Sequence, residues 1–233
     1  MASVRFDIMT LFPEYCDAVL SESIIGRARQ AGIIRVETYN IRDWSKDKFR
    51  RVDDTPYGGG MGMLMKPDPI CDCYDSIVAS AEKKPYTVYM SPKGMPLTQD
   101  KVRELSRLDR IVILCGHYEG VDQRAIDLIA DEEISVGDYV LTGGELPACL
   151  LVDAVSRLVP GVLSDPECYE KESHSDGLLE YPQYTRPYEF RGLTVPDVLL
   201  SGHHENIEKW RRQEAYRLTQ EKRPDLIDRS EKG

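Results

Sequence analysis

The chain has 233 residues, of which 41% are hydrophobic and 30% are charged, and its formal net charge is −10. This composition excludes wholesale disorder and predicts a packed core, with enough chain for one large domain and one small domain. The negative charge argues against general, salt-driven adhesion to nucleic acid, which needs a basic surface. No apolar run approaches the ~20 residues of a membrane span, so we expect no membrane association.

The six cysteines are scattered along the chain, and only Cys71 and Cys73 lie close together in the sequence. The four histidines have no zinc-type spacing relative to these cysteines. We therefore expect a cytoplasmic protein with reduced, buried thiols, and the spacing predicts no metal site.

Strand-like and helix-like segments alternate through the first two thirds of the chain. Apolar or alternating stretches predict strands at 4–9, 33–39, 86–90, 111–115 and 134–136. Helical periodicity and helix-start signals predict helices at 13–32, 67–77, 98–108, 121–129 and 147–159. This alternation predicts an α/β domain with a mostly parallel sheet, ending near residue 162.

Two stretches have no hydrophobic periodicity. Residues 43–66 contain the run Gly58-Gly59-Gly60-Met61-Gly62 and predict a long loop, of a length that is usually functional or disordered. Residues 164–175 are polar and predict a flexible linker. Beyond the linker, apolar residues at helical spacing predict a small helical domain in residues 176–233, with Trp210 in its core.

Three glycine-rich turns each follow a predicted apolar strand, at residues 91–94, 116–120 and 137–144. Ligands of open α/β sheets bind beyond the carboxyl ends of the strands, so these turns together predict a small-ligand pocket. None of them matches the dinucleotide fingerprint or the phosphate loop of nucleotide triphosphatases. A single such turn is better explained as a tight turn alone, and the turns do not identify the ligand.

Two basic clusters stand out against the negative net charge. They are Lys46, Lys48, Arg50 and Arg51, and Lys209, Arg211, Arg212 and Arg217. Either cluster alone is more typical of a solvated surface than of an RNA site. An RNA partner would therefore be recognised locally, and the second cluster is the candidate for phosphate contacts.

A series of ordered motifs covers nearly the whole chain. They are Val52–Met63 (VDDTPYGGGMGM), Ser91–Gly94 (SPKG), Cys115–Gly120 (CGHYEG), Ser135–Pro147, Ser156-Arg157, Pro160–Leu163, Gly177–Leu179 and Tyr184–Pro187. Through them the chain resembles the bacterial tRNA (guanine-N1)-methyltransferase family of the SPOUT class. The resemblance implies methyl transfer to N1 of the guanosine immediately 3′ of the anticodon, position 37 of tRNA.

The resemblance also implies an architecture. It implies a SPOUT-type, mostly parallel sheet with a deep trefoil knot in residues 1–163, the linker 164–175, and a small helical tRNA-binding domain in residues 176–233. General connection rules disfavour threaded chains, so the knot rests on the resemblance alone. The implied assembly is a homodimer with each active site at the subunit interface, and the implied macromolecular partner is tRNA.

The implied methyl donor is S-adenosylmethionine, bound in the knot largely through backbone groups. The residues that the resemblance assigns to it are Tyr89, Ser91, Pro92, Gly116, Val136, Gly137, Asp138, Tyr139, Val140 and Leu141.

The reaction requires a base and a positive charge. N1–H of guanine is a weak acid, so a carboxylate must take its proton, and a guanidinium can stabilise the charge that spreads to O6. The resemblance assigns these roles to Glu172 and Arg157. The family usually has aspartate at position 172, and glutamate moves the carboxylate by roughly one C–C bond, about 1.5 Å. Asp176 is the neighbouring alternative base.

Five further residues are assigned to the guanine substrate. They are Asp53, Asp54, Gly58 and Gly59 in the long loop, and Glu119. Carboxylates can accept hydrogen bonds from the N1 and N2 donors of guanine. Glu119 is also the residue that would lie near Mg²⁺, which family members use, although no ligand cluster indicates a metal site.

Two alternatives remain open at this stage. One is a related SPOUT methyltransferase with another RNA target, against which Asp53, Asp54 and the small domain argue. The other is a non-catalytic RNA-binding dimer whose base is compromised by the change at Glu172. His117 is equally consistent with a packing role and a functional one.

Overall fold

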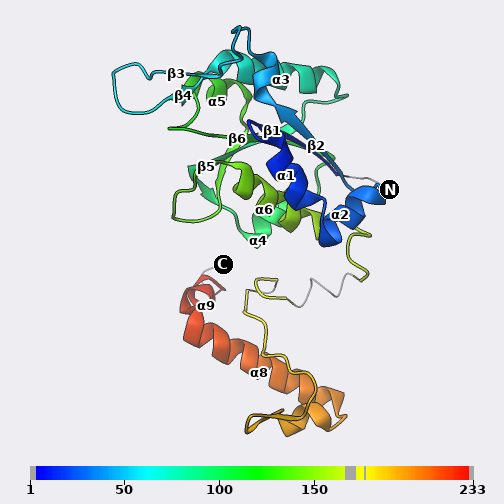
Figure 1. Ribbon diagram of the computed structural model, residues 1–233. Helices are drawn as coiled ribbons and strands as arrows, with labels where there is room; N and C mark the ends of the chain where they lie inside the picture. Colours follow the sequence, from blue (N-terminus) through cyan, green and yellow to red (C-terminus); the bar gives the residue numbers. More distant parts are fainter. Residues whose placement is uncertain (1–3, 166–171, 176, 231–233) are drawn as a thin grey trace. The chain divides into compact units, whose positions relative to one another are not determined.

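The computed structural model describes residues 4–165, 172–175 and 177–230 of the chain. The chain divides into two compact units, residues 1–164 and residues 165–233. Figure 1 shows the sheet of the first unit and the long helix of the second.

A five-stranded sheet forms the centre of the first unit, with strand order β2-β1-β6-β5-β7. Its strands are β1 (Arg5–Thr10), β2 (Arg35–Asn40), β5 (Tyr86–Pro96), β6 (Arg110–Cys115) and β7 (Glu132–Ser135). Every pairing between neighbouring strands is parallel. The predicted α/β domain with a mostly parallel sheet is therefore confirmed.

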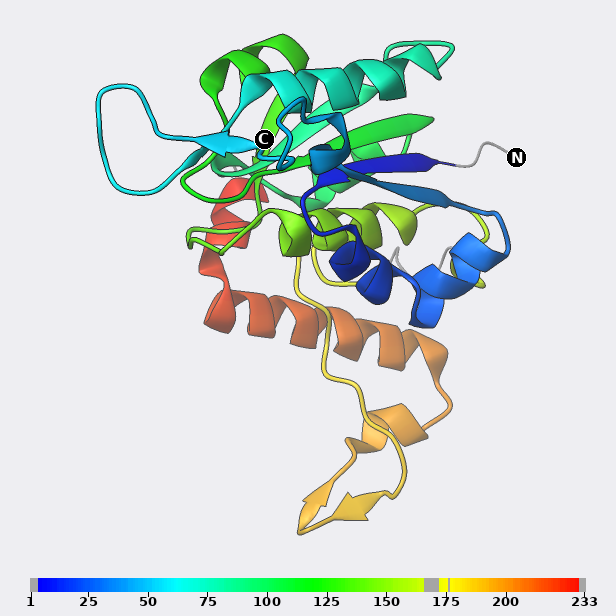
Figure 2. The same cartoon turned by 45° about the horizontal axis from the view of Figure 1, so that its top comes forward.

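Helices cover both faces of this sheet, as Figure 2 shows. One face carries α1 (Pro13–Leu20), α2 (Ser23–Gln30), α4 (Gln99–Leu105) and α6 (Glu145–Ser156). The other carries the 3-10 helix η1 (Ile41–Trp44) with α3 (Pro67–Ala79) and α5 (Gln123–Ile129).

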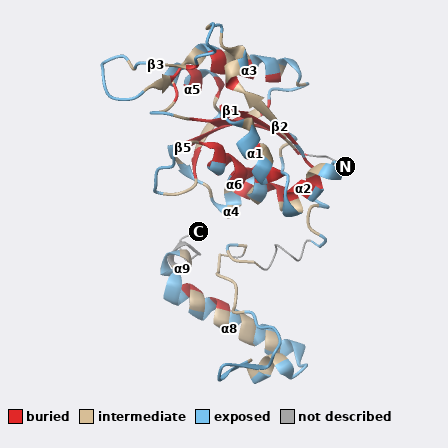
Figure 3. Cartoon of the chain, in the orientation of Figure 1, coloured by how far each residue is buried: buried red, intermediate tan, exposed pale blue. Residues whose placement is uncertain are grey.

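Each face has its own hydrophobic core because the side chains of a strand alternate between faces. Along β6, Ile111 and Ile113 pack into the core under α6, whereas Val112 and Leu114 pack into the core under α3. All four are fully buried, which explains why β6 is apolar without alternation. Figure 3 shows this burial along the central strands.

The structure corrects two predicted elements. The single helix predicted at 13–32 is two helices, because the chain turns at Ser21 and Glu22 between α1 and α2. The strand predicted at 86–90 continues to Pro96, because its second half pairs with β7 after a shift of register between Met90 and Met95.

Local signals were more reliable elsewhere in the first unit. Thr98 caps α4 as its sequence position indicates, since its hydroxyl oxygen accepts a hydrogen bond from the Lys101 N–H at 3.3 Å. The long loop at 43–66 also holds a short antiparallel pair, β3 (Asp53–Asp54) and β4 (Leu64–Met65).

The second unit is built around one long helix. It contains the hairpin β8 (Glu189–Phe190) and β9 (Leu193–Thr194), the 3-10 helix η2 (Asp197–Leu200), α8 (His204–Lys222) and α9 (Pro224–Ser230). Trp210, predicted as core, is half-buried, with its ring 6.4 Å from that of Tyr184. Among the described residues, no helix is long and apolar enough to cross a membrane.

Candidate functional site

The three glycine-rich turns of the first unit line one cavity. The first is the irregular stretch 91–94 within β5, where the register with β7 shifts, and the other two follow β6 and β7. All three lie at the same edge of the parallel sheet. The cavity volume is about 270 Å³, close to the lower end of the range typical of small-molecule sites, about 300 Å³. The predicted convergence of the turns is confirmed.

Most residues assigned to the donor lie in this lining. They are Tyr89, Ser91, Pro92, Gly116, Val136, Tyr139, Val140 and Leu141. Gly137 and Asp138 belong to the same loop but lie outside the lining. Glu119, assigned to the guanine, lines the cavity as well.

Direct backbone contact joins the turn after β6 to the turn after β7. The Gly144 N–H donates a hydrogen bond to the Gly116 carbonyl at 2.8 Å. A Cβ atom at Gly144 would lie 2.7 Å from the Cys115 Cα and 2.9 Å from the Gly116 nitrogen. Only glycine fits there without displacing backbone, so position 144 sets the shape of the pocket wall.

Tyr89 forms a neutral polar part of the wall. Its side chain is buried, and a Cβ atom at Gly116 would lie 2.8 Å from its hydroxyl oxygen. Burial, followed by the negative charge of Glu133, raises the pKa of Tyr89 to about 12. Tyr89 therefore stays protonated at neutral pH and can donate a hydrogen bond into the pocket.

The long loop is attached to the turn after β6. The Glu119 N–H donates to the Met63 carbonyl at 3.0 Å, and the Met65 N–H donates to the Gly120 carbonyl at 2.9 Å. Gly62 packs so closely on the Glu119 side chain that a Cβ atom would overlap it. Glu119 thus lies between the cavity and the loop that carries Asp53 and Asp54.

The glycines predicted to face guanine lie further along this loop. Gly58 and Gly59 have positive φ angles of +85° and +82°, and no described atom lies within 4 Å of a Cβ atom built on either. The structure therefore brings Glu119 into the cavity but leaves the predicted guanine residues Gly58 and Gly59 outside its lining.

Arg157 lies at the opposite end of α6 from the cavity. Pro147, in the first turn of α6, lines the cavity, whereas Arg157 follows the last helical residue and is half-buried. The Arg157 N–H donates to the Asp153 carbonyl at 3.1 Å. The helix between these ends is roughly 18 Å long at about 1.5 Å per residue. One chain therefore does not bring Arg157 into its own cavity.

Glu172 belongs to the second unit. Its carbonyl accepts a hydrogen bond from the Ser175 N–H at 3.1 Å, and the His174 N–H donates to the Leu178 carbonyl at 2.8 Å. The first of these bonds closes a turn at residues 172–175, which carries the Glu172 side chain. Asp176, the alternative base, lies outside the described residues.

A buried contact that was not predicted from the sequence lies behind the pocket wall. The Thr10 hydroxyl donates to Glu145 Oε1 at 2.8 Å, and both side chains are buried. A Cβ atom at Gly143 would lie 2.8 Å from the Nδ1 atom of His117, which is buried and makes no hydrogen bond to the described residues. The available signal was an acid directly after a glycine pair and just before a predicted helix, whose first turn in the structure begins at Glu145.

His117 has both a packing role and a place in the site. Its ring centroid lies 5.0 Å from that of Phe12 and 4.9 Å from that of Tyr118. The same residue lines the cavity and forms an isolated β-bridge with Gly143. The described residues contain no group of three or more His, Cys, Asp or Glu side chains arranged to hold a metal ion.

The fold and site define an α/β protein with a preformed small-ligand pocket at the carboxyl edge of a parallel sheet. Glycine turns shape its wall, and their sequences match neither the glycine motif of dinucleotide-binding proteins nor the phosphate loop of nucleotide triphosphatases. A second unit with the long, highly charged helix α8 follows. A pocket of this kind is typical of a protein that binds a small molecule.

Comparison with known proteins identifies the family. Residues 4–229 match the family model described as tRNA (guanine-1)-methyltransferase TrmD. The chain therefore belongs to this family. The predicted family and enzyme class, methyl transfer to N1 of guanine in tRNA, are thereby confirmed.

Relatives named tRNA (guanine-N(1)-)-methyltransferase align with almost the full chain. The relative from Ruminiclostridium cellulolyticum is 57% identical over 226 residues, covering 97% of each chain. The relative from Clostridioides difficile is 54% identical, covering 97% of this chain and 99% of its own. The relative from Lachnospira eligens is 54% identical, covering 96% of this chain and 94% of its own.

Proposed function

We propose that the chain transfers a methyl group from S-adenosylmethionine to N1 of the guanosine immediately 3′ of the anticodon in tRNA. The observation that carries this proposal is the cavity formed by three glycine turns in a chain of this methyltransferase family. The non-catalytic alternative predicts donor binding without methyl transfer, and the single-turnover assay below separates it from the proposed reaction.

The cavity suits the proposed donor. Backbone N–H and C=O groups of the turns lie at the cavity and can form hydrogen bonds with an adenine ring. Val136, Val140 and Leu141 offer apolar surface to the same ring. Tyr89 adds a neutral hydroxyl donor. When bound, S-adenosylmethionine supplies the electrophilic methyl group.

Glu172 and Arg157 are the proposed catalytic residues. The Glu172 carboxylate takes the proton from N1 of guanine while the N1 lone pair forms the bond to the methyl carbon and the methyl–sulfur bond breaks. The Arg157 guanidinium stabilises the negative charge that develops on O6. Asp53, Asp54, Gly58, Gly59 and Glu119 form the proposed guanine-binding group, and Mg²⁺ is a proposed additional ligand beside Glu119.

The proposed architecture of residues 1–163 includes the deep trefoil knot. The knot rests on the family, and the close packing of the Gly144 backbone on that of Cys115 and Gly116 is compatible with it. Residues 164–175 are the proposed flexible linker, and residues 176–233 the proposed tRNA-binding domain.

A homodimer with its active sites at the subunit interface is also proposed. Helices α1 and α6 lie side by side and expose apolar side chains on the first unit. These side chains are Tyr15, Val19, Leu146 and Leu150, with Phe12 immediately before α1. Soluble monomers rarely leave such a patch uncovered. A second subunit would cover it, and the separation of Arg157 from its own cavity supports an arginine supplied by that subunit.

A single-turnover assay with radiolabelled S-adenosylmethionine tests the reaction. We expect methylation of unmodified tRNA that has guanosine 3′ of the anticodon, and none when adenosine replaces it. The methylated base is then identified by nucleoside analysis. Methylation of the adenosine variant, or of another tRNA position, would contradict the proposal and favour a different RNA target.

Mixing two inactive variants tests the shared active site. Arg157→Ala removes the arginine, and Gly116→Val blocks the cavity by overlap with Tyr89. If the arginine comes from the second subunit, heterodimers contain one complete site, and random re-association restores about a quarter of the native activity. No recovery from a mixture shown to contain heterodimers would contradict this assignment.

A further inference from the structure

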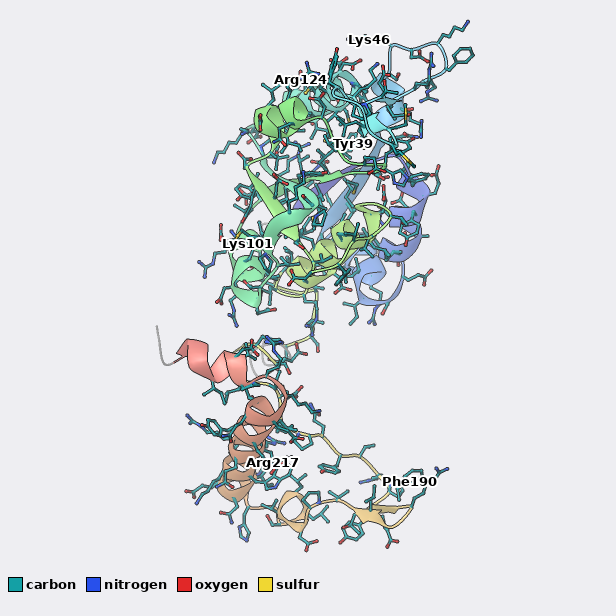
Figure 4. All side chains as sticks on the ribbon, turned by 90° about the vertical axis from the view of Figure 1, so that its left-hand side faces the viewer. Tyr39, Lys46, Lys101, Arg124, Phe190 and Arg217 are labelled. Carbon is teal, nitrogen blue, oxygen red and sulfur yellow. The ribbon has the colours of Figure 1, made fainter. Side chains whose placement is uncertain are left out.

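The cavity lining contains one lysine, Lys93, one histidine, His117, and one acidic side chain, Glu119. Several other lysines of the first unit are paired with carboxylates. Lys46 lies 2.7 Å from Asp72, and Lys101 lies 2.7 Å from Glu104; both lysines are labelled in Figure 4. The ion pairs within the described part of the chain include none for Lys93, which is exposed at the cavity.

The backbone at Lys93 is held in place although its side chain is exposed. The Lys93 N–H donates to the hydroxyl oxygen of Ser91 at 3.2 Å, and Ser91 is buried in the lining. Gly94 packs directly on the backbone of Glu133 in β7, so a Cβ atom there would overlap it. The Lys93 side chain therefore extends from a fixed backbone position in β5, at the edge of the cavity.

The proposed donor carries one negative group, the carboxylate of its amino-acid part, together with an ammonium and a sulfonium. A carboxylate taken from water into a site without a cation or sufficient hydrogen bonds loses affinity. The rest of the lining offers the imidazole of His117, uncharged side chains, backbone groups and the negative charge of Glu119. Lys93 is thus the positive charge in the described lining that can pair with the carboxylate.

We propose that Lys93 binds the carboxylate of the donor's amino-acid part and selects ligands that carry it. This inference rests on the proposed donor site. It makes Lys93 a residue for donor affinity and discrimination, separate from the proton transfer assigned to Glu172. Glu119, the acid of the same lining, complements the positive charge at the other groups of the donor.

Isothermal titration of the full chain with two ligands tests the inference. The ligands are S-adenosylmethionine and its decarboxylated form, which keeps the adenosine, the sulfonium and the ammonium. The variants are Lys93→Gln, Lys93→Arg as the conservative change, and Lys83→Met as the matched control. Lys83 is an exposed lysine that precedes the opposite end of β5.

We expect Lys93→Gln to weaken S-adenosylmethionine about tenfold, equal to about 1.4 kcal/mol. It should leave the decarboxylated ligand within about twofold of the native value, because that ligand has no carboxylate to lose. Lys93→Arg should keep most of the affinity, and Lys83→Met should bind both ligands as the native chain does. The native affinity for S-adenosylmethionine should also fall with added salt more steeply than that of Lys93→Gln.

Equal losses for both ligands in Lys93→Gln, or no loss for either, would overturn the assignment of Lys93 while leaving the donor site intact. A native chain that binds neither ligand would instead contradict the proposed donor site itself. The two failures are therefore distinguishable in one set of titrations.

Discussion

The sheet of the first unit has a hydrophobic core on each face, whereas only Ala215 and Thr219 are buried among the described residues of the second unit. The cavity of the first unit is shaped by backbone packed on backbone, as at Gly144 and Gly116. The surface of the second unit is shaped by exposed side chains on α8. The first unit is therefore suited to a small rigid ligand, and the second to contacts that form with a partner.

The charges of α8 illustrate the difference. Arg211 pairs with Glu208, and Arg217 pairs with Glu214 and Glu221, all on the same helix. Figure 4 labels Arg217 on this helix. Exposed pairs of this kind contribute little to stability. A phosphate can replace such a carboxylate partner at small cost, whereas no ligand can replace the backbone contacts of the cavity wall.

The largest expected effect separates chemistry from donor binding. Glu172→Gln should slow methyl transfer by about 10²–10⁴-fold, because the amide cannot take the N1 proton. Titration should show unchanged affinity for S-adenosylmethionine, because the cavity belongs to the first unit. Glu172→Asp, which restores the residue usual in the family, should remain active.

Asp176→Asn is the control for this substitution. If Asp176 were the base instead, Asp176→Asn would lose activity and Glu172→Gln would keep it in the same single-turnover assay. That result would reverse the assignment of the base.

Gly144→Ala should damage the first unit next most strongly. The new Cβ atom would press on the backbone of Cys115 and Gly116, and overpacking of this kind costs about 1–3 kcal/mol. We expect a lower midpoint of thermal unfolding and weaker binding of S-adenosylmethionine. Gly202→Ala in the second unit is the matched control.

At Gly202 the backbone φ is +71° and nothing lies within 4 Å of an added Cβ atom, so only backbone strain results. Donor affinity should stay native in Gly202→Ala. A similar loss of donor affinity in both variants would show that the effect is a general destabilisation rather than a change in the cavity wall.

Thr219→Val should weaken the second unit alone. The Thr219 hydroxyl accepts from the Leu179 N–H at 2.8 Å and donates to the Ala215 carbonyl at 2.7 Å. Leaving the Leu179 N–H without its acceptor costs about 1–3 kcal/mol. Hydrogen exchange should rise along α8 and the KM for tRNA should increase, while donor affinity stays unchanged.

Thr219→Ser keeps the hydroxyl and should preserve slow exchange along α8. If Thr219→Val exchanged as slowly as the native chain, this hydrogen bond would not hold the second unit together. A change in donor affinity would contradict the independence of the cavity from this unit.

The smallest expected effect concerns single basic side chains of α8. Arg212 is exposed, and Arg212→Ala should lower tRNA affinity modestly. The slope of the logarithm of the binding constant against the logarithm of salt concentration should become smaller by about one. Filter binding at several salt concentrations measures the slope. Lys83→Ala, a charge change of the same sign in the first unit, should leave it unchanged; an equal change in both variants would indicate a general charge effect.

Much of the first unit was predictable because its signals are local. The unbroken apolar run at 111–115 gave β6, and Thr98 gave the start of α4, each from a few neighbouring residues. The long strand β5 was predicted too short because Ser91 to Gly94 has a turn-like composition. These residues form the irregular stretch between Met90 and Met95, and the strand resumes at Met95 because it pairs with Ile134, some 40 positions away in the chain.

The site shows the same division. The three glycine turns and most of the lining follow from strands that end at one sheet edge. The distance of Arg157 from the cavity does not follow from the sequence, since it depends on the direction of α6 across the sheet. That no carboxylate of the described residues pairs with Lys93 also depends on which acidic side chains the fold brings near it.

The sequence by itself determined the alternation of strands and helices, the three turns at their ends and, through its motif series, the methyltransferase family. Only the tertiary structure decided how tightly the turns meet, which residues share the cavity, and that Thr10 and Glu145, 135 positions apart, form a buried contact behind it. The physical reason is the sequence distance over which each effect acts. Turn and strand preferences depend on a few neighbouring residues, whereas packing joins segments that are far apart in the chain, and no regular spacing in the sequence marks them.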